Sequence, residues 1–163
     1  LDAFNTSPYV DMAQAIQATM AEAGIEVSII QAETKAVYPK HRARNFRMIL
    51  THWSPDYLDP HSNADAFASN PDNSDAAKLT GVIAWRGAWD TPENTALTAA
   101  ARQELDADKR KEMYLTLQKN LQQDSPFVFM FQNVAQAALR SNVQGFISGP
   151  SFDQVFYRDV SKS

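Results

Sequence analysis

The sequence of 163 residues contains no cysteine. This absence excludes disulfide bonds, thiolate metal ligands and a cysteine nucleophile, although it leaves the redox compartment open. The uninterrupted apolar runs are only a few residues long, far below the ~20 residues of a membrane-spanning helix. No Gly-x-Ser-x-Gly motif occurs, which argues against a serine hydrolase with a nucleophile elbow.

A large excess of one charge is also lacking. The 15 lysine and arginine residues and the 19 aspartate and glutamate residues are interspersed and give a net charge of −4. Because no basic stripe follows a predicted helix, we expect no nucleic-acid partner. The one basic stretch, KHRARNFR at 40–47, is typical of a solvated helix face.

A chain of this length, with 44% apolar residues, is long enough for one core but short for two. We therefore expect residues 1–163 to form a single domain, or part of one lobe of a larger protein. The opening LDAF shows neither an initiator methionine nor a signal peptide, so the sequence looks cut from a longer polypeptide.

The first thirty residues predict a strand, a helix and a second strand. Residues 1–4 are a short strand candidate, and Ser7 followed by Pro8 is typical of an N-cap and the first helical position. Gly24 can take the left-handed conformation that ends a helix. Residues 25–30 then read as a strand, and a helical connection between two strands favours a parallel pair.

The middle of the chain continues the alternation and then becomes irregular. We expect a short helix over 35–44 and a third strand over 46–53. Residues 54–80 are rich in proline, aspartate, asparagine and serine, which predicts mostly loop. A long irregular segment inside a compact domain is usually functional or mobile.

Helices return from Pro92 onward. Met113, Leu117 and Leu121 form an apolar stripe that we expect to pack on the sheet. FVFMF at 127–131 predicts a buried strand, and the remaining residues predict turns and short extended pieces. The pattern as a whole predicts an α/β fold with a mixed sheet flanked by helices.

Three blocks carry a resemblance to a known family: AQAIQATMAEAGIEVSII, then NFRMILTHWSPDYLDP, then TPENTALTAAARQELDADKRKEMYLTLQKNLQQDSPFVFMF. In this order the sequence resembles the C-terminal half of the family 5 extracellular solute-binding proteins, the peptide, dipeptide and nickel receptors of bacterial ABC importers. The resemblance implies that residues 1–163 are part of the C-terminal lobe of a two-lobe, type II periplasmic binding protein.

The same resemblance implies a function. The protein would capture a peptide or other small solute between two lobes and deliver it to ABC permease subunits in the membrane. It would be periplasmic, or lipid-anchored and extracellular in a Gram-positive organism. It would need no cofactor and no metal, and it would not be an enzyme. Oligopeptides, dipeptides, opines, short sugars and metal chelates all stay open as ligands.

The loop that follows the third predicted strand is the first candidate ligand site, because ligands of open α/β sheets collect outside the carboxyl ends of strands. The resemblance assigns Trp53 as an aromatic wall and Asp56 as the carboxylate that receives the α-ammonium of a peptide. Tyr57 is a further candidate. From the residues alone, Asp56 after Pro55 could equally be a turn residue, and Trp53 could belong to the core.

The second candidate is AWRGAWD at 84–90, where relatives have another loop that lines the cleft. Arg86 could receive a ligand carboxylate with two hydrogen bonds, or stack on a neighbouring ring without any ligand. Trp85 is the adjacent aromatic candidate.

Two other classes of function are open. The chain has three histidines near three aspartates, a set that could hold a metal and make the protein a metal-dependent hydrolase: His41, His52, His61, Asp56, Asp59 and Asp65. The spacing matches no compact ligand motif, because His52 and His61 lie nine residues apart across a proline-containing loop. The other alternative is a sensor or interaction lobe without a transport role.

Overall fold

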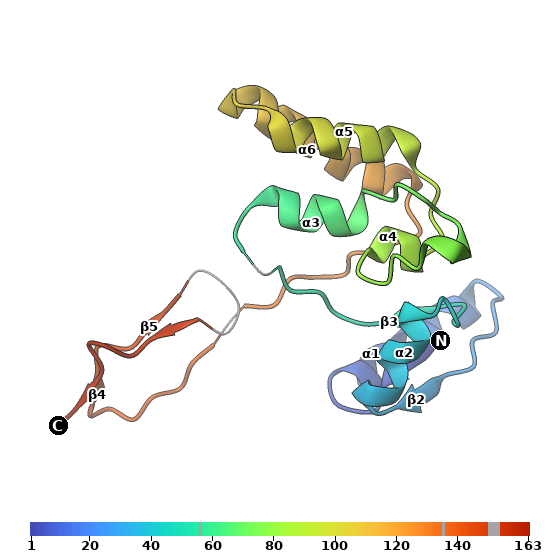
Figure 1. The fold of residues 1–163 in the computed structure, drawn as a ribbon. Coiled ribbons are helices and arrows are strands. Elements are labelled where there is room, and N and C mark those ends of the chain that lie inside the picture. Colours follow the sequence, from blue (N-terminus) through green and yellow to red (C-terminus); the bar gives the residue numbers. More distant parts are fainter. Residues whose placement is uncertain (56, 135, 150–153) are drawn as a thin grey trace. The chain divides into compact units, whose positions relative to one another are not determined.

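The computed structural model describes residues 1–55, 57–134, 136–149 and 154–163. These residues form two compact units, and each unit combines two stretches of the chain. We call Leu1–Trp53 with Asn70–Pro92 the sheet unit, and Ser54–Ser69 with Glu93–Ser163 the helical unit. Figure 1 shows the elements of both units in chain order, from the blue N-terminus to the red C-terminus.

The sheet unit contains three parallel strands in the order β2-β1-β3. The central strand β1 (Asp2–Phe4) pairs with β2 (Ile30–Ala32) on one side and with β3 (Ile49–Leu50) on the other. Helix α1 (Tyr9–Glu22) provides the crossover between β1 and β2. The parallel first pair predicted from the sequence is therefore confirmed.

Helix α1 buries one face on this sheet, where Ala3, Ala13 and Leu50 form a core. Its end agrees with the prediction, since Gly24 has a φ of +76° and donates its backbone N–H to Ala21. The start of the helix differs from the prediction, because Pro8 and not Ser7 occupies the N-cap. The hydroxyl of Ser7 instead hydrogen-bonds to the Asp11 carboxylate at 3.3 Å.

The predicted second helix is present as α2 (Thr34–Arg42). The basic stretch at 40–47 begins in this helix, and not all of its cations face solvent as predicted. Lys40 forms a 2.6 Å ion pair with Asp2, a residue that is 6% exposed. Arg44 lies beyond the helix with a φ of +56° and folds its side chain inward. The prediction of a solvated face is wrong for Lys40 and Arg44, because their partners lie far away in the sequence and the local pattern does not show them.

The rest of the sheet unit is a short 3-10 helix η1 (Asp75–Ala77) and a one-turn helix α4 (Ile83–Arg86).

The helical unit is built from α3 (Pro60–Phe67), α5 (Pro92–Gln103) and α6 (Ala107–Asp124), which lie side by side in Figure 1. Helix α3 lies within the segment that we predicted to be mostly loop. Its start is an Asp-Pro step, because Asp59 caps the helix and Pro60 occupies its first turn, where a missing N–H costs nothing.

The apolar stripe of α6 packs on helices, which corrects the prediction that it packs on a sheet. Tyr114 and Leu117 of α6 form a buried cluster with Ala68 and Ala101. Met113 and Leu121 pack at the border of this cluster, together with other half-buried residues. Periodicity identified the buried face correctly, but it carries no information about which element covers that face.

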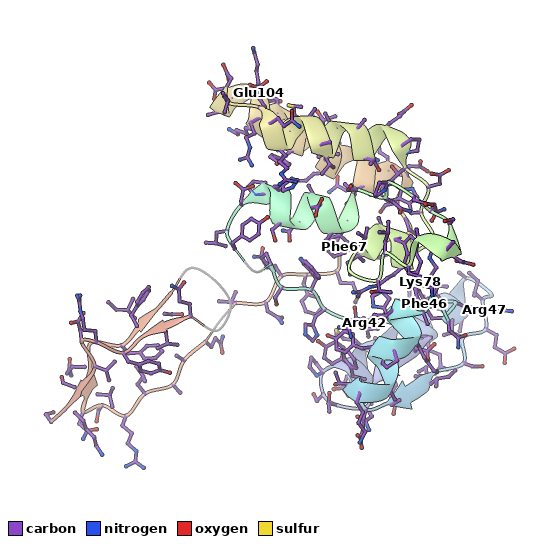
Figure 2. The ribbon with its side chains drawn as sticks, viewed as in Figure 1. Arg42, Phe46, Arg47, Phe67, Lys78 and Glu104 are labelled. Atoms are coloured by element: carbon purple, nitrogen blue, oxygen red, sulfur yellow. The ribbon has the colours of Figure 1, made fainter. Side chains whose placement is uncertain are left out.

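The strand predicted at 127–131 is also wrong. These residues are extended but pair with no strand in the described part of the chain, and Phe129 is 58% exposed. Phe127 and Phe129 each pack on Phe67 with ring centroids 5.4 Å apart (Phe67 is labelled in Figure 2). An apolar run becomes a buried strand only where a neighbouring strand supplies its hydrogen bonds.

The C-terminal residues form short antiparallel pairs, as the turn-rich sequence predicted. Strand β4 (Val143–Gln144) pairs with β7 (Ser161–Lys162), and β5 (Ile147–Ser148) pairs with β6 (Val155–Phe156). The chain thus contains parallel and antiparallel pairs, although the two kinds lie in different sheets.

Candidate functional site

An aromatic cluster lies at the carboxyl edge of the parallel sheet. It consists of Phe4 at the end of β1, Tyr9 at the start of α1, Tyr38 on α2, and His52 just after β3. The ring of Phe4 lies 4.8 Å from Tyr9, 5.5 Å from Tyr38 and 5.9 Å from His52, measured between centroids. The hydroxyl of Tyr9 lies 2.6 Å from Nδ1 of His52. We call these four residues the edge cluster.

The edge cluster sits where the topology places ligands. Strands β1 and β3 run parallel, so the residues after Phe4 and after Leu50 emerge at one edge of the sheet. Burial, followed by the neighbouring Tyr38 hydroxyl, raises the pKa of the Tyr9 phenol. Trp53 follows His52 directly and is 38% exposed. The sequence placed Trp53 at the end of a strand over 46–53, whereas β3 ends at Leu50 and Trp53 lies three residues beyond it. The contribution of Tyr9 to the same edge was not predicted.

Tyr57 belongs to the helical unit and is 51% exposed. It lines a shallow hollow of about 250 Å³ with Leu58 and the first residues of α3. Asp56, the predicted receptor for an ammonium group, lies outside the described residues. The ligand-binding roles of Tyr57 and Asp56 stay predictions.

Trp85 and Arg86 are both buried in the sheet unit, at 4% and 9% exposure. The indole N–H of Trp85 donates to the carbonyl of Ser74 at 2.9 Å, and Nε of Arg86 donates to the carbonyl of Thr80 at 2.8 Å. Burial, followed by the charge of Arg42, lowers the pKa of the Arg86 guanidinium. Both side chains thus hydrogen-bond to backbone carbonyls of the sheet unit. Their role toward a ligand stays a prediction.

Arg44 is the residue that sequence reasoning missed here. Its guanidinium stacks on the indole of Trp85, 3.8 Å from the ring centroid. It also donates to the carbonyl of Trp85 at 2.5 Å, to the carbonyl and side chain of Asn73, and to the Asp75 carboxylate at 2.9 Å. The arginine that stacks on Trp85 is therefore Arg44, 41 positions away in sequence, and no local signal points to it.

Comparison with known proteins shows what this α/β arrangement is similar to. Residues 2–75 match the model of the bacterial extracellular solute-binding proteins, family 5 Middle. The probable D,D-dipeptide-binding periplasmic protein DdpA of Escherichia coli strain K12 is 26% identical over 152 residues, which cover 93% of this chain and 28% of that protein. Di/tripeptide-binding protein 4 of Pseudomonas aeruginosa strain UCBPP-PA14 is 29% identical over 138 residues, 85% of this chain and 25% of that protein.

Solved structures agree on the fold. A dipeptide-binding protein from Pseudoalteromonas sp. SM9913, in complex with Met-Leu, superposes with a TM-score of 0.73 at 20% identity, over 99% of this chain and 31% of that chain. The chain therefore resembles the family 5 extracellular solute-binding proteins, whose model matches residues 2–75. The predicted resemblance to this family and the predicted α/β fold of a type II periplasmic binding protein are confirmed.

The chain spans about a quarter of the length of the curated relatives described above. These relatives are named for binding their ligands and not for a reaction. No described helix has the length and apolar character needed to cross a membrane.

The alternative of a metal-dependent hydrolase requires a group of metal-ligating side chains. In the part of the chain that the structure describes, no three histidine, aspartate or glutamate side chains come together to hold a metal ion. His52 contacts Tyr9, and Nε2 of His61 lies 4.0 Å from the Asp65 carboxylate. His41 is buried beside a cation.

His41 is 6% exposed, and its Nδ1 lies 3.5 Å from Nη1 of Arg86. Phe46, labelled in Figure 2, packs edge-on against its ring with centroids 5.3 Å apart. Burial, followed by the charges of Arg86 and Arg42, lowers the pKa of His41 to about 4. His41 is therefore neutral near pH 7, which removes a charge that Arg86 would otherwise repel.

This neutral histidine predicts a pH dependence of stability. The folded state binds the His41 proton only below about pH 4, whereas an unfolded histidine binds it below about 6.5. Stability is therefore complete above pH 6.5 and falls by about 1–3 kcal/mol as the pH drops toward 4. We expect His41→Gln to flatten this slope. Urea unfolding followed by tryptophan fluorescence measures it, because all three tryptophans lie in the sheet unit. Equal slopes in both proteins would contradict the assignment.

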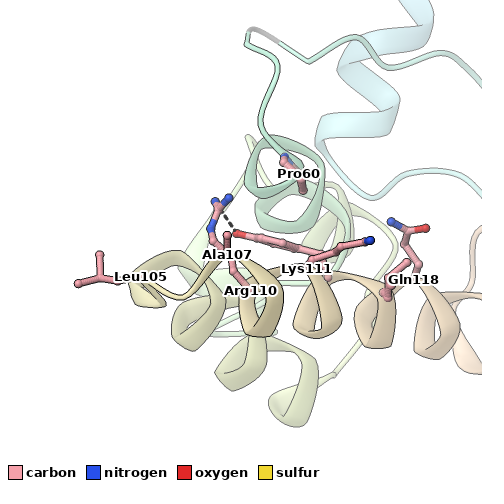
Figure 3. A pocket seen from close by; sticks show the side chains of 8 residues that line it. Pro60, Leu105, Ala107, Arg110, Lys111 and Gln118 are labelled. Atoms are coloured by element: carbon pink, nitrogen blue, oxygen red, sulfur yellow. Dashed lines mark hydrogen bonds between the residues drawn. The ribbon is translucent and has the colours of Figure 1, made fainter.

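Asp59 has two roles in the helical unit. Its carboxylate accepts the backbone N–H of His61 at 2.8 Å, and it pairs with Nη2 of Arg110 at 2.7 Å. The hydrogen bond from Arg110, followed by that from the His61 backbone, lowers the pKa of Asp59. Arg110 also donates to the Tyr114 hydroxyl at 3.2 Å, and both line a groove of about 330 Å³ along α6 that Figure 3 shows. The Asp59-Pro60 step therefore has a structural role at the start of α3.

Replacing Asp59 by alanine removes the cap of α3 and is expected to lower stability by about 1–2 kcal/mol. Asp59→Asn is the matched control, because asparagine keeps a capping oxygen and loses only the charge, so it should cost less. Asp59 stabilises the fold above its ordinary pKa of 3.8, and this contribution is lost as the pH falls through the lower folded value. Urea unfolding monitored by far-UV circular dichroism, at pH 7 and at pH 3, tests both statements. Alanine and asparagine variants of equal stability at pH 7 would argue against the cap.

Proposed function

We propose that the protein to which this chain belongs is the substrate-binding component of an ABC importer. It would capture a peptide or another small solute between two lobes and deliver it to membrane permease subunits. The chain, residues 1–163, would be part of the C-terminal lobe. The compartment would be the periplasm, or the outer face of the membrane with a lipid anchor in a Gram-positive organism.

The observation that carries this proposal is the half-exposed Trp53, three residues beyond the carboxyl end of β3 and within residues 2–75, which match the family. An indole at that place offers a large apolar face to a ligand, which suits a receptor that accepts varied side chains. The relatives give the ligand class: they are named for D,D-dipeptides and for di- and tripeptides.

The proposed binding residues have separate tasks. Trp53 and Tyr57 would contact the body of the ligand, and Asp56 would receive its ammonium group. Trp85 and Arg86, which are buried in the sheet unit, would contribute through the 84–90 loop. The protein would bind its ligand without converting it, and it would need no metal and no cofactor.

A ligand screen tests the proposal. Thermal unfolding of the purified protein would be measured with Ala-Ala, Ala-Phe, Ala-Ala-Ala, maltose and Fe(III)-EDTA. A receptor saturated at one hundred times its dissociation constant gains about 2.7 kcal/mol, which is a clear rise in melting temperature. Mass spectrometry of the incubated peptide checks for turnover. A peptide that stabilises the protein and is recovered intact is expected, whereas cleavage of the peptide would favour the hydrolase alternative.

A further inference from the structure

We propose that the imidazole of His52, held by the Tyr9 hydroxyl, is a ligand-binding donor that recognises an acceptor oxygen of the peptide. This inference rests on the proposed function, since it requires a ligand at the carboxyl edge of the sheet. It adds two residues, His52 and Tyr9, to a site that sequence reasoning had limited to the loops at 53–57 and 84–90.

The geometry fixes the ring of His52 in one place. Its Nδ1 is engaged by the Tyr9 hydroxyl at 2.6 Å, and the ring also packs against Phe4, 5.9 Å between centroids with an interplanar angle of 60°. Phe4 is itself only 2% exposed and belongs to β1, so the partner that positions the histidine is part of the sheet. A side chain that is exposed yet held from two sides is preorganised for a contact with solvent or ligand.

The same hydrogen bond determines which ring nitrogen carries the proton. We assign the Tyr9 hydroxyl as the donor to Nδ1 across this 2.6 Å contact. With Nδ1 as the acceptor, the imidazole N–H lies on Nε2, since one ring nitrogen accepts and the other donates. Among the residues that the structure describes, none hydrogen-bonds to Nε2 of His52. Within the described part of the chain, this N–H therefore has no acceptor.

A peptide supplies the matching acceptor. Every amide carbonyl and the terminal carboxylate offer oxygen atoms to an N–H donor. His52 immediately precedes Trp53, so the backbone of both residues emerges at the same edge of the sheet. An N–H donor suits backbone recognition, because it tolerates any side chain and leaves the ammonium group to a carboxylate.

The experiment measures peptide affinity of the full-length protein by calorimetry with Ala-Ala, Ala-Phe and Ala-Ala-Ala, using whichever binds most tightly. His52→Phe keeps a flat ring without the donor and is expected to weaken binding about 3- to 10-fold. His52→Gln is the matched control, because its side-chain amide retains an N–H, and it should recover most of that loss. Tyr9→Phe should weaken binding in the wild-type background but have no further effect beside His52→Phe.

The C-terminal amide of the same peptide distinguishes the two sources of oxygen. If His52 binds the carboxylate, His52→Phe costs less affinity with the amide than with the acid.

The outcomes separate this inference from the function it rests on. Peptide binding that is equal in wild type, His52→Phe and His52→Gln would overturn the role of His52 and leave the receptor intact. If the full-length wild-type protein binds none of the three peptides, the proposed function as a peptide receptor is wrong, and so is this inference. Unfolding without ligand is measured on every variant, and a loss of affinity counts only where the melting temperature equals that of wild type within experimental error.

Discussion

Replacing Leu117 by alanine is expected to lower the free energy of unfolding of the helical unit by about 2–5 kcal/mol. Leu117 is only 2% exposed and packs against Ala68, Ala101 and Tyr114. Two of these neighbours are alanines, whose short side chains cannot move into the space that the leucine leaves. The substitution therefore loses the transfer free energy of the side chain and also leaves a cavity.

The same substitution at Leu105 is the matched control, because that side chain is 97% exposed just before α6. Leu105→Ala should change stability by less than about 0.5 kcal/mol. Urea unfolding is followed by circular dichroism, which is dominated by helices, and in parallel by tryptophan fluorescence, which reports the sheet unit alone. Ligand affinity well below the melting temperature should not change. A Leu117→Ala protein as stable as Leu105→Ala, or one that is stable but binds poorly, would mean that α6 does not form this core.

The elements that the sequence predicted well are those determined by neighbouring residues. The helix at α1 has an apolar face with a helical period and ends at Gly24, whose positive φ suits glycine. The parallel pairing of β1 and β2 follows from the helix between them, because a crossover of that kind joins parallel strands. These features need no knowledge of distant residues.

The elements that were predicted wrongly depend on distant partners. Residues 127–131 have the composition of a buried strand, but in the described structure no strand pairs with them. Helix α3 was assigned to a loop because its residues are polar, and it forms because Asp59 caps it and Arg110 of α6 holds that carboxylate. Composition describes what a segment would form alone, and tertiary contacts override it.

In the candidate site, too, some features could be predicted from neighbouring residues and others depend on distant partners. The position of Trp53 after a strand end could be predicted, because strand order and the rule for ligand sites in α/β sheets are enough. The burial of Trp85 and Arg86 could not, because it results from the long-range contacts of Arg44 and from the carbonyl of Thr80. The contact between Tyr9 and His52 joins residues 43 positions apart, which a single sequence does not reveal.

Replacing Asp56 by asparagine is expected to weaken peptide binding in the full-length protein by about 2–5 kcal/mol. The resemblance assigns this carboxylate to the α-ammonium of the ligand. A hydrogen-bonded charge pair in a closed cleft is shielded from water, and removing one charge leaves the other buried without a partner. Asparagine keeps the shape of the side chain, so stability without ligand should change much less than affinity.

The alternative role of Asp56 makes the opposite prediction, and one set of measurements decides between them. A turn aspartate would contribute a hydrogen bond, roughly 0.5–1.5 kcal/mol of folding stability, and its loss would leave affinity unchanged. Calorimetry and thermal unfolding are therefore done on the same Asp56→Asn protein, with Ala-Ala-Ala and with its N-acetylated form. The acetyl group removes the positive charge, so the wild type should strongly prefer the free amine and the variant should discriminate less. If Asp56→Asn binds the free amine as tightly as wild type, another acceptor receives the ammonium group. Asp59 is then a poor substitute, because its carboxylate is already held by Arg110 and by the first turn of α3.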